Sequence, residues 1–156
     1  MGRRLAGLVI VCAVAMVCAA QQPVAFPHDK HVKMGLTCVD CHIGADVQDR
    51  ATIPSVQKCM LCHAKLARNS SEVQKVIGYA NRGIEIPWVR VYGFTNDAHV
   101  KFQHEPHYRA GISCATCHGD VAKMTVAERA VTHNMGTCLT CHRQRNGPQD
   151  CAACHY

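Results

Sequence analysis

Cysteine in this chain follows one repeated pattern, a CxxC pair with His directly after it. Ten of the 12 cysteines stand in five such units, and the other two lie in the first 20 residues. The units are Cys38, Cys41 and His42; Cys59, Cys62 and His63; Cys114, Cys117 and His118; Cys138, Cys141 and His142; and Cys151, Cys154 and His155. The last two occupy residues 138–155, where almost no apolar sequence remains to pack around them. Something other than side chains must therefore fill the space between units.

CxxCH is the attachment signature of c-type haem. The two thiols add to the two vinyl groups of the porphyrin, and the His binds the iron from one side. A disulfide framework is one alternative, because an exported chain with an even number of cysteines often has one. A zinc ribbon is another, because the spacing between Cys41 and Cys59 would allow it. Neither alternative uses a His after all five pairs, so the sequence predicts five covalently bound c-type haems.

The size of the chain then limits its fold. Without its first 20 residues it has about 27 residues for each haem, too few for an ordinary apolar core around each one. Aromatic residues make up only 5% of the sequence. We therefore expect a small, mostly irregular and α-helical multihaem fold, with short helices, little sheet and a core made of packed haems.

Residues 1–20 have the pattern of a secretory signal peptide. Arg3 and Arg4 precede an apolar stretch at 5–17, and small residues follow it. An uncleaved anchor is the alternative, but the stretch is shorter than the ~20 residues that a spanning helix needs. We expect cleavage, a mature domain of residues 21–156 in the periplasm or outside the cell, and no stable membrane span after the signal is removed.

The charge balance is weakly basic. Without Arg3 and Arg4 the chain has 15 basic and 11 acidic residues, a net charge of about +4. The basic residues are spread along the chain, and the carboxylates of bound haem would reverse the sum. We therefore expect no nucleic-acid partner.

A seventeen-residue repeat organises the chain. Residues 26–42 and 102–118 share the frame F-x-H-x-x-H-x-x-x-G-x-x-C-x-x-C-H without a gap, and each copy is followed by one further CxxCH. This predicts a di-haem module at 26–63, a connector at 64–99, a second di-haem module at 102–142 and a fifth haem at 151–155.

Five irons each need a partner on the side opposite the attachment His. Imidazole is a strong iron ligand, and two spare histidines recur at the same places in both frames, which predicts the distal ligands His28, His31, His104 and His107. The spacing does not say which haem each one serves. For the remaining haem the candidates are His133, Met135 and His99.

The connector contains one helical pattern. Ser71 and Gln74 have the spacing of a capping box. Val73, Val76, Ile77 and Ala80 follow on one face of a helix. The segment IEIPWVRVYGF after Gly83 is β-branched and aromatic, and its Pro argues against a helix. This segment is predicted either to cover haem edges or to dock a partner through Trp88 and Tyr92.

The F-x-H-x-x-H frame with its CxxCH resembles the class III multihaem cytochromes c, which are small exported electron carriers with bis-His haems. The resemblance covers essentially the whole mature chain. The count of five units, the IPWVRV segment and the Met-Gly before the fourth unit resemble more narrowly the pentahaem subunit of alternative complex III, a bacterial membrane quinol oxidoreductase. That narrower resemblance implies an axial ligand at or near Met135.

These features predict electron transfer between redox protein partners in respiration, without catalysis. Closely packed haems can pass electrons along the chain, and their potentials depend on ligands, burial and charge. The alternatives are a subunit of a membrane quinol oxidoreductase or of a polymeric cytochrome assembly. A multihaem oxyanion reductase is a further alternative, but it would need an iron with an open coordination position.

Overall fold

The computed structural model describes residues 21–156, so the signal peptide predicted at 1–20 lies outside the described residues. The described chain is helical and irregular, without a strand, and Val100 and His155 form an isolated antiparallel bridge. The predicted fold class is confirmed. The elements are α1 His28–Lys33, α2 Cys38–Cys41, α3 Val56–His63, α4 Ser71–Arg82, η1 Asn96–Ala98, α5 His104–Arg109, α6 Cys114–His118, η2 Val121–Lys123, α7 Met135–Arg145 and α8 Cys151–Cys154.

All five CxxC pairs lie within helices, and a small polar residue directly precedes each of these helices. In four of them the side chain of that residue accepts a hydrogen bond from a backbone N–H of the first turn, as an N-cap does. These four residues are Ser55, Ser113, Asn134 and Asp150. In α2 the Asp40 carboxylate accepts from the backbone N–H of Thr37 at 2.6 Å. The helical turn places the two cysteines of each pair, three residues apart, on one face.

Helix α4 confirms the predicted apolar face, but the predicted cap was wrong. Val73, Val76 and Ile77 are buried. Ser71 is the first helical residue rather than the cap, and the Gln74 side chain donates to the carbonyl of Arg68 instead of closing a capping box. The helix ends at Gly83 with φ of 66°, a left-handed conformation that glycine adopts without a steric penalty.

Buried apolar side chains are few and gather at one end of the molecule. The buried hydrophobic residues among 21–156 are Val24, Val56, Val73, Val76, Ile77 and Ile86. Trp88 is partly buried against this group, which makes it part of the packing between α3, α4 and the connector. From residue 87 to 156 no residue is buried. The protein's own side chains therefore form only a small core, which packs α3 against the connector.

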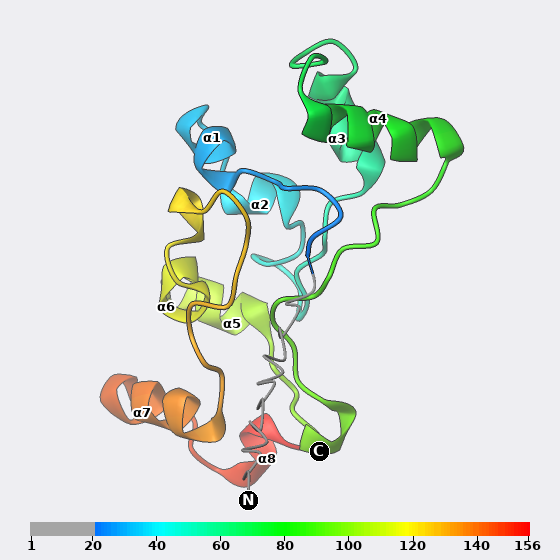
Figure 1. Ribbon diagram of the computed structural model, residues 1–156. Helices are drawn as coiled ribbons and strands as arrows, with labels where there is room; N and C mark the ends of the chain where they lie inside the picture. The colour runs from blue at the N-terminus through cyan, green and yellow to red at the C-terminus, as the bar shows by residue number, and fades with distance from the viewer. Residues whose placement is uncertain (1–20) are drawn as a thin grey trace, which may run out of the picture.

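The helices follow one another in an extended arrangement (Figure 1). Helices α3 and α4 pack together at the upper right of the view and α1 and α2 lie at the upper left, α5 and α6 are in the middle, and α7 and α8 lie at the other end. Within the described residues, no helix has the length and apolar character needed to cross a membrane.

Candidate haem-attachment and ligand sites

The structure brings each of the four frame histidines opposite a different attachment histidine. The distances between ring centres lie within a narrow range, from 5.9 to 6.5 Å. Two of the pairs have nearly parallel ring planes, at 10° and 5°. The pairs are His28 with His42, His31 with His63, His104 with His118, and His107 with His142.

These distances fit one metal ion between two imidazoles. A histidine nitrogen lies about 2 Å from a first-row metal ion, and the ring centre lies about 1.2 Å behind that nitrogen, so two rings on opposite sides of one ion have centres about 6.4 Å apart. One histidine of each pair directly follows the CxxC thiols of its unit in the sequence. The residues present therefore fit a haem that is held by two thioethers and ligated by two histidines.

Backbone carbonyls hold most of these rings in one orientation. In seven histidines Nδ1 donates to a carbonyl oxygen at 2.5 to 3.1 Å, which leaves Nε2 unprotonated and available to a metal, as metal-binding histidines usually require. The bonds run from His31 to Pro27, His42 to Thr52, His63 to Leu66, His104 to Asp49, His107 to Gln103, His142 to Pro148 and His155 to Ala98.

In each frame a phenylalanine contacts both frame histidines, a role that was not predicted from the sequence. Phe26 stacks on His31 with ring centres 4.3 Å apart and meets His28 edge-on at 4.7 Å. Phe102 contacts His107 at 4.7 Å and His104 at 4.9 Å in the same way. One aromatic ring in each frame therefore positions both frame histidines. The recurrence of Phe at the first position of the frame was the signal for this role.

The five attachment units are neighbours in an order that differs from their order in the sequence. Burial raises the pKa of five thiols, and for four of them a cysteine of another unit, close enough to interact electrostatically, adds to the rise. The neighbours are Cys59 with Cys41, Cys38 with Cys114, Cys117 with Cys138, and Cys138 with Cys154. The order in space is second, first, third, fourth and fifth unit.

The second frame also contacts the loop that follows the first unit. The backbone N–H of His104 donates to the carbonyl of Asp49 at 3.0 Å, and its ring Nδ1 donates to the same oxygen at 3.1 Å. The backbone N–H of Glu105 donates to the carbonyl of Gln48 at 3.2 Å. A loop that follows the first unit thus positions a histidine of the second frame.

The fifth unit is anchored by the segment that precedes the second frame. The ring of His155 donates to the Ala98 carbonyl, and the backbone N–H of Tyr156 donates to the His99 carbonyl at 3.2 Å. The His99 ring meets the Tyr156 ring edge-on at 5.9 Å. His155 is the attachment histidine that is not brought opposite another histidine ring within the described chain.

The other two candidates for a sixth ligand lie in different places. His133 is beside the third unit, where its Nε2 donates to the carbonyl of Cys117 at 2.6 Å. Met135 begins α7, one turn before Cys138, and its side chain is 67% exposed. Met135 is on the same helix as Cys138, whose thiol is close enough to Cys154 of the fifth unit to interact with it electrostatically.

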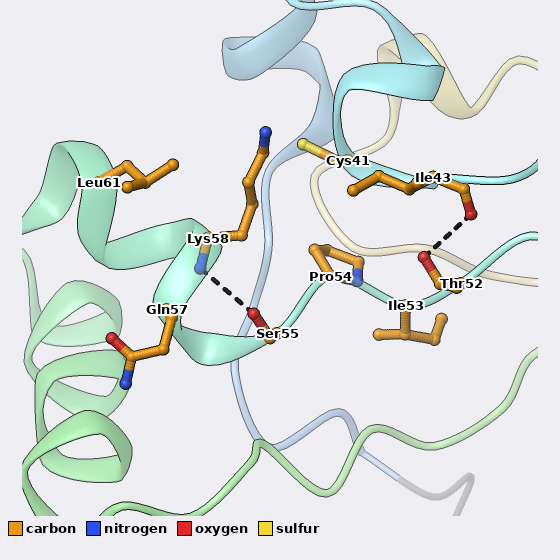
Figure 2. A pocket seen from close by; sticks show the side chains of 9 residues that line it. All are labelled: Cys41, Ile43, Thr52, Ile53, Pro54, Ser55, Gln57, Lys58 and Leu61. Carbon is orange, nitrogen blue, oxygen red and sulfur yellow. Dashed lines mark hydrogen bonds between the residues drawn. The ribbon is translucent and has the colours of Figure 1, made fainter.

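A cavity lies between the first unit and α3 (Figure 2). Its walls include the Cys41 thiol and the apolar side chains of Ile43, Ile53 and Leu61, which are exposed on the polypeptide. Exposed apolar side chains that form a contiguous group, unlike scattered ones, are a mark of a binding surface. An apolar wall beside an attachment cysteine fits the face of a porphyrin.

These sites define a multihaem protein of the c type. Residues 11–82 match the class III cytochrome c family, and residues 100–156 match cytochrome c7 and related cytochrome c. The chain is also 35% identical over 57 residues to a protein named cytochrome c3 from Desulfuromonas acetoxidans, an alignment that spans 36% of this chain and 79% of that protein.

The chain belongs to the class III cytochrome c family, whose members are electron carriers with several covalently bound haems. The predicted family is confirmed.

Proposed function

We propose that this chain carries five covalently attached haems and relays electrons between redox protein partners outside the cytoplasm. The observation that carries the proposal is the set of four histidine pairs with ring centres 5.9 to 6.5 Å apart, each with one member directly after a CxxC pair. The ten cysteines of the units form the thioether links. The axial ligands are the four histidine pairs, and His155 with Met135 for the fifth unit.

Haem iron supplies reversible one-electron chemistry, and its potential follows the axial ligands and their surroundings. The chain's residues determine the path. The proximity of Cys41 to Cys59, of Cys38 to Cys114 and of Cys138 to its neighbours supports a continuous route through the second, first, third, fourth and fifth units. The proposed ends of the route are α3 and α8.

A thioether ligand from Met135 would distinguish the fifth unit from the others. Methionine ligation raises the potential of a haem relative to bis-histidine ligation. The exposed position of Met135, one turn before Cys138 and its neighbour Cys154, supports this assignment. The hydrogen bond of His133 to Cys117 counts against His133 in that role. The haem of the fifth unit, at the α8 end of the path, would then be the most readily reduced of the five.

The proposed electron transfer has two forms, a free carrier and a subunit of a larger assembly, which differ in their protein partners. A free carrier would be monomeric, whereas a subunit of a membrane quinol oxidoreductase or of a polymeric assembly would co-purify with other chains. Light scattering and pull-down from native membranes distinguish the two. An oxyanion reductase is disfavoured because four of the five attachment histidines already face a second histidine.

A reductive titration followed by absorption spectroscopy tests the proposal. The mature polypeptide has a charge of about +4, and ten propionates would bring it to about −6 with ferrous iron, so each added electron should make the next harder to add. We expect a curve broader than five identical, independent sites would give, centred at negative potentials, and narrower at high salt where haem edges meet solvent. A single one-electron curve at every ionic strength would contradict the proposal.

A further inference from the structure

Three segments meet behind the attachment histidine of the third unit. Tyr92 comes from the end of the connector, His118 ends α6, and His133 lies in the loop before α7. The Tyr92 ring meets the His118 ring edge-on, with centres 4.8 Å apart and planes at 89°. The His133 ring stacks on Tyr92 at 4.6 Å and lies 5.9 Å from His118. The imidazole of His118 is therefore flanked by two rings, which we call the Tyr92–His133 cluster.

Hydrogen bonds attach this cluster to the backbone of the third unit. The Tyr92 hydroxyl donates to the His118 carbonyl at 3.4 Å and accepts from the N–H groups of Ala130 and Val131 at 3.0 and 3.1 Å. His133 Nε2 donates to the Cys117 carbonyl at 2.6 Å. The last two carbonyls of the attachment motif are thus each bound by a side chain of the cluster.

Two further contacts hold the segments that surround the cluster together. The Arg129 guanidinium donates to the Val91 carbonyl at 2.9 and 3.2 Å and lies 5.7 Å from the centre of the Tyr92 ring. A Cβ added at Gly119 would overlap the Cβ of Ala130. Glycine at 119, with φ of 71°, therefore permits the close approach of the loop to the end of α6.

We propose that Tyr92 and His133 are positioning residues for His118, which hold its ring parallel to that of His104 and fix the third haem's ligand geometry. The ring planes of His104 and His118 differ by only 5°. In the corresponding pair of the first frame, the attachment histidine His42 is held by a hydrogen bond from its Nδ1 to the Thr52 carbonyl. In the second frame, flanking rings take over this role. Such outer partners orient ligands and tune the metal they hold.

This inference rests on the proposed haem at the third unit, and the test distinguishes a failure of the inference from a failure of the proposed function. Mature five-haem protein is prepared as wild type and as the variants His133→Ala, His133→Phe, Tyr92→Leu and Tyr92→Phe. Intact mass reports the number of haems, which tests the proposed function. Low-temperature EPR and the paramagnetic NMR shifts of the haem methyl groups report spin state and the angle between ligand planes, which test the inference.

In His133→Ala and Tyr92→Leu we expect five haems and an unchanged number of low-spin irons, with the signals of one haem of the five broadened or moved. His133→Phe restores ring stacking, so the signals of that haem should return most of the way to their wild-type positions. Tyr92→Phe keeps the ring but lacks the hydroxyl, so its signals should lie between those of Tyr92→Leu and wild type. The control is Tyr79→Leu, because Tyr79 also lies beneath an arginine, at 5.0 Å from Arg82, but packs on the small core between α3 and the connector. The control should leave that haem's signals in place.

Two results would overturn the inference. Conversion of one iron to high spin in His133→Ala, unrepaired in His133→Phe, would identify His133 as a ligand. Signals identical to wild type for all five haems in both His133→Ala and Tyr92→Leu would show that the cluster does not position His118. Loss of a haem from the intact mass of the wild type would instead count against the proposed function.

Discussion

Made without haem attachment, residues 21–156 are expected to be unfolded in solution. The six buried hydrophobic side chains lie within residues 24–86, and no residue from 87 to 156 is buried by the polypeptide itself. Ordering each residue costs conformational entropy that burial of apolar surface must offset, and this chain buries too little of it with its own side chains. The attached haems are expected to supply the missing contact.

The measurement compares far-UV circular dichroism and NMR chemical-shift dispersion of the haem-free chain with those of the mature five-haem protein. We expect coil-like dichroism, collapsed dispersion and no cooperative thermal transition without haem. A haem-free chain that keeps the helical dichroism and melts cooperatively would contradict this account of the core. A partial transition confined to α3 and α4 would agree with it, because their contact includes most of the buried residues.

Replacing His104 by Ala is expected to convert one of five irons from low spin to high spin without loss of covalent haem. The two thioethers of the third unit remain, but the ring that faces His118 at 6.4 Å is removed. The same change is expected for alanine at His28, His31 or His107, each at a different haem. Absorption and EPR spectra, with the intact mass of each variant, provide the measurement.

His99→Ala is the matched control, because the His99 ring contacts Tyr156 rather than an attachment histidine. It should leave all five irons low spin, whereas Met135→Ala should affect one. If the His104→Ala variant kept a low-spin signal equal to wild type, His104 would not be a ligand.

The sequence predicted the parts of the site that depend on short, repeated spacing. The CxxCH units and the frame histidines recur at fixed positions, so their chemistry could be inferred from residue type and spacing alone. Which frame histidine faces which unit could not be predicted. His28 faces the unit in its own repeat, while His31 faces the unit that follows it, and that choice depends on how α3 folds back.

The order of the units in space also could not be predicted from the sequence. The second unit lies at one end because α3 packs on α4, which leaves Cys38 of the first unit to meet Cys114 of the third. The helix at 71–82 was predictable because its apolar residues have helical periodicity. Its cap was mispredicted at Ser71 because Ser70 and Ser71 are adjacent, and local pattern cannot choose between them.

Intact mass spectrometry of the mature protein, expressed with haem-ligation machinery, tests the central claim most directly. We predict a single main species that begins near Gln21 and carries five covalent haems, one for each CxxCH unit. A mature species with fewer than five haems, or one whose mass is explained by disulfides between the ten cysteines, would contradict the account.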